Sequence, residues 1–281
     1  MLKILMSFFA FCLLFTLPVS AQEFDEQERP RDGFYDQKTV LESRPIEFAH
    51  VREADVLWSK RIWQSIDVRK TINQPLYFPE RPTGNYRSLM QVLEDAIRAG
   101  EIRAYDVDDD SFIREPHDPD ELFDEILTRT EVIVIEGEEV EEVIPFRPTD
   151  VLVFRIKEEW FVDSRHGALN VRIIGLSPAR LVRDDVTGEF TDITDPLFWI
   201  PYEEARPVLA RAPVVNRRND KQVESFDDLF IRRFFDATVY REERPDNRAI
   251  REYIDDPRER LLEARRIKEE IRNFELDLWQ Y

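Results

Sequence analysis

The sequence predicts an α+β fold: a single mixed domain with an antiparallel sheet, flanking helices, an extended N-terminal arm and a long C-terminal helix. Runs of β-branched residues separated by hairpin-length turns fill the middle of the chain, and such short turns join antiparallel strands. Helical patterns lie on both sides of these runs. No low-complexity linker divides residues 54–256, so we expect one core domain there, followed by a helix over residues 257–281.

Residues 1–21 are expected to be a secretory signal peptide. Lys3 supplies a positive charge, Ile4 to Leu17 is apolar, and Val19-Ser20-Ala21 is a small-residue cleavage site. The apolar run is too short for a spanning helix, although an uncleaved anchor is the alternative. The one cysteine, Cys12, lies inside this run and not at the cleavage point that lipidation requires. We therefore expect an exported, unlipidated mature protein.

The mature chain is strongly acidic. The whole sequence has a net charge of −19, and loss of Lys3 with the leader removes one more positive charge. Such a field repels nucleic acid and anionic lipid, so we expect no nucleic-acid binding and only indirect membrane attachment. Without Cys12, disulfides, thiolate metal sites and cysteine nucleophiles are excluded. A hydrophobic content of 42% is sufficient for a full core.

Residues 22–53 are polar and have no periodicity before Val51. Several acidic residues precede Arg29-Pro30-Arg31, and the segment has no apolar set that would form a core. We predict an extended arm. Two interpretations remain open: a flexible leader, or an arm that becomes ordered on a neighbouring subunit.

The stretch from Asp55 to Pro75 predicts an amphipathic helix. Asp55 is a good N-cap, Trp58, Ile62 and Ile66 recur every four residues, and Pro75 ends the pattern. The tryptophans of this stretch are expected to pack in the core, and residues 76–78 to form an extended segment.

Two shorter helices and an acidic loop should follow. Asn85 can cap a helix over residues 86–99, and Asp118 can open another that ends at residue 127. Between them, residues 106–110 place acids at positions 1, 3 and 5 of a calcium loop, but Ser111 and His117 occupy positions 6 and 12. We predict a solvated acidic loop and leave cation binding open.

The next part of the chain predicts strands. Residues 132–135 and 140–144 are expected to form a hairpin around a turn at 136–137, and four further strands should follow it. Ser225 and Asp228 can cap the second of two short helices, over residues 201–210 and 226–235. The four further strands cover residues 151–156, 159–163, 169–176 and 179–183.

The last helix is specified by Asp256 as its cap and Pro257 at its first position. Apolar residues then recur at alternating spacings of three and four, which is a coiled-coil-like seam. The seam can pack on its own domain or on another subunit, and both interpretations remain open. Its members are Ala264, Ile267, Ile271, Phe274 and Leu278.

A search for catalytic patterns finds none of the common nucleophile, metalloprotease or nucleotide-binding motifs. Glu158 and Glu159 beside Trp160 are the most suggestive carboxylate pair. On a strand, however, successive side chains point to opposite faces, so these two carboxylates should diverge. We therefore expect no enzymatic activity, no metal and no cofactor.

Three aromatic-rich blocks carry a resemblance to a known family. They are Ala54–Pro79, Ile156–Asp163 with Val171–Pro178, and Leu197–Leu209 continuing to Asn216 and Ser225–Phe235. In this order they resemble the GldN/PorN family, a periplasmic component of the gliding-motility and type IX secretion machinery. The resemblance extends from about residue 51 to residue 253.

The resemblance implies a non-enzymatic structural subunit. It implies self-association in a periplasmic ring with a GldK/PorK-like lipoprotein, and contact with the periplasmic part of a GldL/GldM-like (PorL/PorM-like) motor. The chain would lie in the periplasm, at the inner side of the outer membrane, and reach that membrane only through the lipoprotein.

Partner-binding residues are expected in two places, the arm and the C-terminal seam. Two other functions remain alternatives: a periplasmic carbohydrate- or peptide-binding module that uses Trp160 or Trp199, and a hydrolase. The expected partner-binding residues are Arg29, Arg31, Phe34, Tyr35 and Phe48 in the arm, and Ile267, Ile271 and Phe274 in the seam.

Overall fold

The chain divides into two compact units, Met1–Gln37 and Lys38–Tyr281. A computed structural model describes residues 40–135, 138–165, 167–183, 190–215 and 224–278, all of them in the second unit. The predicted leader and the arm residues Arg29, Arg31, Phe34 and Tyr35 lie outside the described residues. No helix in the described ranges is long and apolar enough to cross a membrane.

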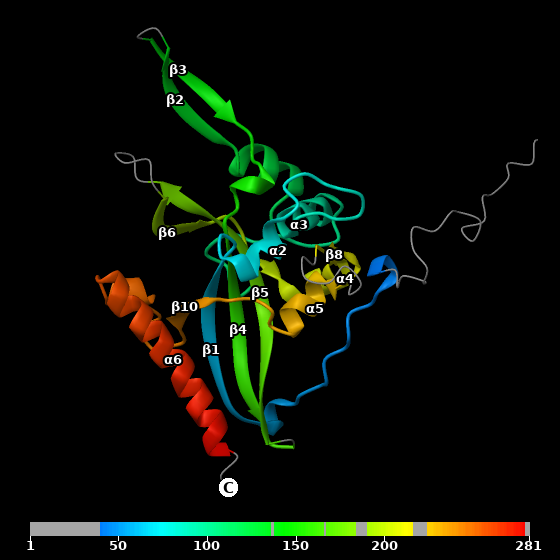
Figure 1. Ribbon diagram of the computed structural model, residues 1–281, viewed down its shortest axis with the longest axis vertical. Coiled ribbons are helices and arrows are strands. Elements are labelled where there is room, and N and C mark those ends of the chain that lie inside the picture. Colours follow the sequence, from blue (N-terminus) through cyan, green and yellow to red (C-terminus); the bar gives the residue numbers. More distant parts are fainter. Residues whose placement is uncertain (1–39, 136–137, 166, 184–189, 216–223, 279–281) are drawn as a thin grey trace, which may run out of the picture. The chain divides into compact units, whose positions relative to one another are not determined.

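The second unit is built on an antiparallel sheet, which confirms the predicted α+β class (Figure 1). Its strands lie in the order β10-β1-β4-β5-β6, and the short strand β7 also pairs with β5. The pairing of each neighbouring couple is antiparallel. The strands are β1 (Val56–Asp67), β4 (Val153–Asp163), β5 (Ala168–Arg183), β6 (Phe190–Pro196), β7 (Ile200–Pro201) and β10 (Thr238–Glu242).

The helix predicted from Asp55 is wrong, because residues Val56–Asp67 form strand β1. A spacing of four residues returns to the same face in a strand as well as in a helix, so Trp58, Ile62 and Ile66 satisfy both periods. A strand forms here because β1 pairs along almost its whole length with β4 and also pairs with β10. Asp55 ends a 3₁₀ turn, Glu53–Asp55, instead of capping a helix.

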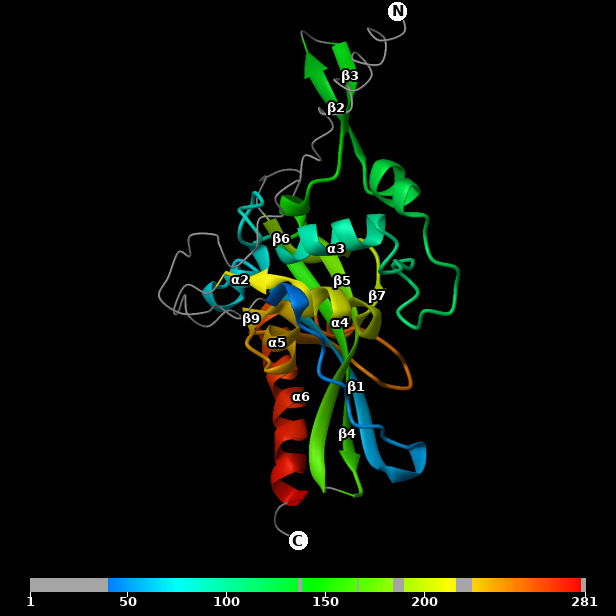
Figure 2. The same ribbon diagram turned by 90° about the vertical axis from the view of Figure 1, so that its right-hand side faces the viewer.

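Helices cover one face of this sheet and enclose the main core (Figure 2). Ile66, Phe154 and Ile156 project from the sheet into this core, where Phe198 and Phe226 are fully buried among helix residues. The helices of this layer are α2 (Gln74–Tyr77), α3 (Leu89–Arg98), α4 (Tyr202–Arg211) and α5 (Phe226–Ile231). A small two-stranded sheet of β8 (Pro213–Val214) and β9 (Glu224–Ser225) precedes α5.

Several helix boundaries differ from the prediction. Ser88, not Asn85, caps α3, because its side chain and that of Gln91 form a complete capping box. Pro75 lies near the start of α2, so Leu76 and Tyr77 are helical instead of extended. The helix expected to begin at Asp118 is a π-helical segment, Glu121–Ile126.

Other local predictions are confirmed. The Ser225 and Asp228 side chains form the predicted capping box of α5. The four predicted strands exist, but each neighbouring two fuse into one long strand, β4 or β5. Further 3₁₀ turns cover Val40–Glu42, Thr71–Asn73, Pro148–Asp150 and Ile250–Glu252.

The C-terminal helix α6 (Pro257–Leu278) packs on its own domain, on the β1 and β10 side of the sheet (Figure 1). Asp256 caps the first turn as predicted, because its carboxylate accepts a hydrogen bond from the Arg258 amide at 2.7 Å. Ile267 and Ile271 are buried in a cluster with Ile62 of β1 and with residues of β10 and the loop after it. Of the two interpretations left open by the sequence, packing on the chain's own domain is the one found.

The predicted hairpin is present and is separate from the main sheet (Figures 1 and 2). Strands β2 (Arg129–Ile135) and β3 (Glu138–Ile144) pair with each other along seven positions each. Among the described strands, neither pairs with any other.

Candidate functional site

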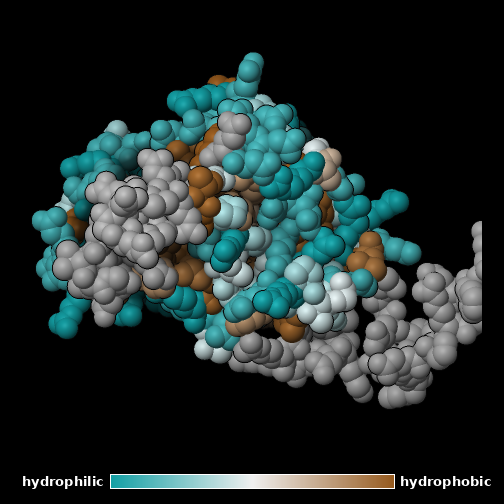
Figure 3. All heavy atoms as spheres, turned by 90° about the horizontal axis from the view of Figure 1, so that it is seen from above, coloured by the Kyte–Doolittle hydropathy of each residue, from teal (hydrophilic) through white to brown (hydrophobic). Residues whose placement is uncertain are grey.

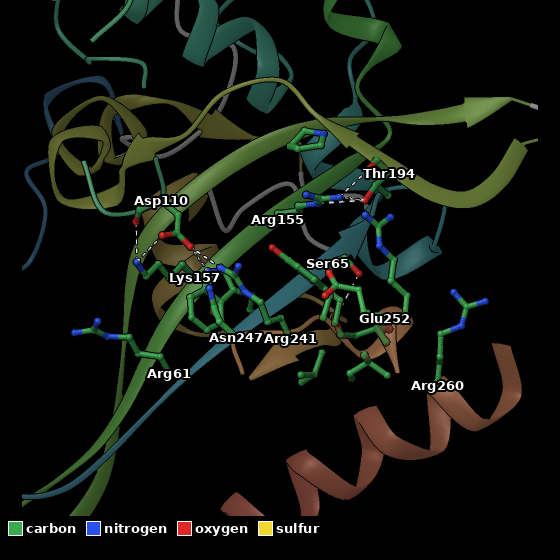
Figure 4. A pocket seen from close by; sticks show the side chains of 18 of the residues that line it. Arg61, Ser65, Asp110, Arg155, Lys157, Thr194, Arg241, Asn247, Glu252 and Arg260 are labelled. Atoms are coloured by element: carbon green, nitrogen blue, oxygen red, sulfur yellow. Dashed lines mark hydrogen bonds and ion pairs between the residues drawn. The ribbon is translucent and has the colours of Figure 1, made fainter. Parts of the chain in front are cut away.

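A cavity of about 880 Å³ lies on the face of the sheet opposite the main core (Figure 4). Strand alternation creates it. Ile62, Gln64 and Ile66 of β1 point to the helix-covered face and are buried there, so the intervening side chains of the strand point the other way. These intervening residues, Arg61, Trp63 and Ser65, line the cavity.

The strand register brings basic residues together across the cavity floor. Trp63 of β1 lies opposite Lys157 of β4 and Arg241 of β10. Two positions along, Ser65 lies opposite Arg155. Directly opposite residues of an antiparallel pair have Cβ atoms about 5 Å apart, so the basic residues of β4 and β10 form a basic row around Trp63 and Ser65 of β1.

Trp63 is the platform of this row. The Arg241 guanidinium carbon lies 3.7 Å from the indole centroid, and the Lys157 ammonium lies 5.6 Å from it. Both cations therefore interact favourably with the π face of the ring. The indole Nε1 donates to Asp110 Oδ2 at 2.9 Å, which fixes the ring in its plane.

Asp110 lies in the loop after α3 and pairs with two cations. Arg241 Nη2 lies 2.5 Å from Oδ2, and Lys157 Nζ lies 3.3 Å from Oδ1. Burial favours the neutral carboxyl, but the charges and hydrogen bonds of Lys157 and Arg241 outweigh it and lower the pKa of Asp110. Asp110 is therefore ionised at neutral pH and holds the basic row in place.

This loop is not the solvated acidic loop predicted from the sequence. Asp109 is buried and accepts from the backbone amides of Ile113 and Arg114 at 3.2 and 2.8 Å, whereas Asp110 turns to the sheet. The carboxylates thus diverge. Within the described ranges, no three potential ligands come together to hold a metal ion.

The loop presses closely on the sheet at Gly175 of β5. A Cβ atom at this position would lie 3.0 Å from the ring of Phe112 and 3.2 Å from that of Trp199. Glycine therefore lets the loop approach without displacing either ring. The Trp199 indole donates to the Val107 carbonyl at 3.1 Å, which closes this wall of the cavity.

Arg155 has a different environment from the other floor cations. Its Nη2 donates to the Thr194 carbonyl at 2.7 Å, and its guanidinium lies 5.1 Å from the Tyr240 ring centroid. Within the described part of the chain, no carboxylate lies at ion-pair distance from it. Burial, together with the nearby charges of Arg251 and Arg241, lowers the pKa of Arg155. Burial also raises the pKa of Tyr240 to about 12, so its hydroxyl stays protonated.

The cavity as a whole has an excess of positive charge. Its lining contains six cationic and three acidic side chains. Guanidinium and ammonium groups with neighbouring hydroxyls recognise carboxylate and phosphate groups. The cations are Arg61, Arg155, Lys157, Arg241, Arg251 and Arg260, and the acids are Asp108, Asp110 and Glu252.

The described part of the arm lies against the chain's own surface. Arg206 donates to the Ile46 carbonyl at 2.5 Å, and Arg165 to the His50 carbonyl at 3.0 Å. Phe48 lies between these contacts, with its ring centroid 4.0 Å from the Arg206 guanidinium and 5.1 Å from that of Arg172. Its side chain keeps 38% exposure.

Arg206 itself is fixed by a buried network. Its guanidinium pairs with Asp227 at 3.1 Å, and the Tyr202 hydroxyl donates to the same carboxylate at 3.0 Å. Paired burial of this kind holds the arginine rigidly. The segment around Phe48 is therefore anchored to α4 and α5.

The other predicted site residues do not join the arm. Ile267 and Ile271 are covered by the chain's own strands, and Phe274 packs on Trp58 with ring centroids 4.6 Å apart. Trp199 is buried and Trp160 is half-buried, so neither is the exposed aromatic that a sugar-binding surface would use.

The predicted divergence of Glu158 and Glu159 is confirmed. Glu158 is buried on the helix-covered side, where Arg233 lies 2.7 Å away. Glu159 projects from the other face and pairs with Arg61 at 3.3 Å. This separation leaves no carboxylate pair for glycoside hydrolysis at this position.

Sequence reasoning missed the basic cavity. Its signal is the alternation of Arg61, Trp63 and Ser65 with Ile62, Gln64 and Ile66, and the matching positions of Arg155 and Lys157 around Ile156. Read as strands, both patterns place charged residues on one face.

The fold is that of an α+β protein with a basic cavity on one face of an antiparallel sheet. Residues 51–280 match the family described as "Gliding motility associated protein GldN". Because the match spans the chain from β1 to α6, the protein belongs to the GldN family and to the gliding-motility-associated machinery. No curated protein matches the sequence.

Proposed function

We propose that this protein is a non-enzymatic structural subunit of the type IX secretion and gliding-motility apparatus. It assembles into a periplasmic ring with a GldK/PorK-like lipoprotein and contacts a GldL/GldM-like motor. The match to the GldN family over residues 51–280 is the observation that carries this proposal. The basic cavity supports it, because its groups suit recognition of a charged partner.

The proposed location is the periplasm, at the inner side of the outer membrane. The leader pattern of residues 1–21 supports export, and the net charge of −19 disfavours direct contact with anionic lipid. The lipoprotein would therefore supply membrane attachment.

A gentle-detergent pull-down of the tagged chain from its native envelope tests this function. We expect ring-shaped particles that contain a lipoprotein, identified by mass spectrometry and negative-stain imaging. A lone monomer at native expression would contradict the proposal and would favour the alternative, a periplasmic peptide- or carbohydrate-binding module.

The arm supplies a second test. Arg29, Arg31, Phe34 and Tyr35 are proposed to bind a neighbouring subunit, with Phe48 as the anchored end of the segment. Deletion of residues 22–37 should abolish co-assembly and leave the thermal melting of the domain unchanged.

A longer deletion is less informative, because residues 46–50 contact Arg206 and Arg165 of the domain itself. A matched control retains the length of residues 22–37 but replaces the four predicted contact residues with serine. Co-assembly by both variants would contradict a role for the arm.

A further inference from the structure

The basic cavity is an exception in a chain whose net charge is −19. Its six cations face three carboxylates, and one of these, Asp110, is shared between Lys157 and Arg241. Among the described residues, neither Arg155 nor Arg251 has an ion-pair partner. A charged ligand of opposite sign would therefore meet cations that the domain has not neutralised.

One side-chain donor of a cavity-lining residue, Arg241, also lacks an acceptor. Nε of Arg241 is buried and has no hydrogen-bond partner in the described part of the structure. Buried donors usually have a partner, because an unsatisfied donor costs about 1–3 kcal/mol. Nε is closed to solvent, so an entering carboxylate meets only the positive charge of Arg241, which lines the cavity.

The hairpin of β2 and β3 has the complementary charge. Residues 129–144 contain six acidic residues and one basic residue. Glu139 and Glu141 are two positions apart in the sequence of β3, the spacing that recurs on one face of a strand.

The hairpin is also without a partner strand outside itself. In the described ranges, β2 and β3 pair only with each other, and both views draw them apart from the main sheet (Figures 1 and 2). An isolated two-stranded hairpin is marginally stable in water, so contact with another surface would stabilise it. Seen from above in Figure 3, the part of the surface that is not grey is mainly hydrophilic, with scattered apolar groups.

We propose that the β2–β3 hairpin of one copy binds in the basic cavity of the next copy. This inference rests on the proposed function, since it supplies the self-association that a ring requires. The hairpin and the cavity are different surfaces of the same chain. The contact is therefore heterologous and can continue from copy to copy. In this contact, the carboxylates of the hairpin pair with Arg155, Arg241 and Arg251 of the cavity.

Charge reversal tests the contact in the full-length protein in its native envelope. The hairpin variant is Glu139→Lys with Glu141→Lys, and the cavity variant is Arg155→Glu with Arg251→Glu. Each variant alone should lower self-association about tenfold or more, because like charges then face each other. Ring particles and sedimentation of the purified chain are the readouts.

Co-expression of the two variants should restore assembly. The lysine hairpin of one then meets the glutamate cavity of the other, and the native hairpin of the second meets the native cavity of the first. Glu80→Lys with Glu115→Lys changes charge equally at exposed positions elsewhere and should leave assembly intact. Arg155→Gln with Arg251→Gln is a milder cavity variant. It tests the same contact if the charge-reversed cavity variant fails to fold.

A crosslink gives an independent result, because residues 22–281 contain no cysteine. Glu139→Cys with Arg251→Cys in one chain should give an oxidised ladder of copies, and either substitution alone should not. Rings without this ladder, and unaffected by charge reversal, would overturn the hairpin contact while the proposed function stands. Absence of any lipoprotein-containing assembly by the unmodified chain would instead overturn the proposed function.

Discussion

The two faces of the sheet around β1 use charge in opposite ways. On the helix-covered face, Glu158 is fully buried and is satisfied by Arg233, Gln64 and the Trp160 indole at 2.7, 2.6 and 3.0 Å. On the cavity face, Asp110 is divided between two cations and Arg155 has no carboxylate partner among the described residues. A complete network stabilises the fold, whereas an incomplete one leaves capacity for a ligand.

The largest expected effect comes from breaking the complete network. Glu158→Ala leaves Arg233, Gln64 and the Trp160 indole without their common acceptor and should lower the free energy of unfolding by about 3–5 kcal/mol. Urea unfolding measures this difference. The neighbouring variant Glu159→Ala is the control, because Glu159 and Arg61 form a partly exposed pair whose loss should cost less than about 1 kcal/mol. Equal losses in the two variants would contradict the contrast between the faces.

An intermediate effect is expected for Asp110→Asn. The amide cannot neutralise Lys157 and Arg241, so we expect a loss of about 1–3 kcal/mol. The pKa of Asp110 is lowered in the folded protein, so its contribution is complete above the unfolded pKa of about 3.9 and disappears as pH falls through the lower folded value. The stability difference between wild type and variant should thus be constant from pH 7 to about pH 5 and shrink below pH 4. A difference that grows in acid would show that Asp110 is not the group responsible.

The smallest expected effect on stability belongs to Arg155→Gln. No carboxylate among the described residues loses a partner, and burial already disfavours the charge, so the free energy of unfolding should change by less than about 1 kcal/mol. Chemical unfolding at low and high salt checks this value. A loss as large as that of Asp110→Asn would mean that Arg155 belongs to a structural network and not to a recognition surface.

Features that depend on neighbouring residues in the sequence could be predicted. The Ser225 capping box, the pairing of β2 with β3 and the start of α6 at Pro257 follow from residues that are near each other in the sequence. The strand β1 could not be assigned in this way, because the spacing of Trp58, Ile62 and Ile66 fits two periods. Pairing with distant strands decides between them.

The cavity illustrates the same limit. Its floor consists of Trp63, Lys157 and Arg241, which come from three strands far apart in the sequence. Asp110 had the appearance of a solvated loop residue until its cationic partners were placed beside it. Charge alone predicted an acidic surface, but the register of three strands concentrates basic residues at one place on it.

The order of strands has a consequence for how the molecule is made. The strand β1, at the start of the domain, lies between β4 and β10, and β10 is the last of the described strands along the chain. Both edges of β1 are therefore hydrogen-bonded to neighbouring strands only after the chain has been made as far as residue 242. Sheets that depend on such distant pairing fold slowly. The sheet is consequently complete only when almost the whole domain has been synthesised.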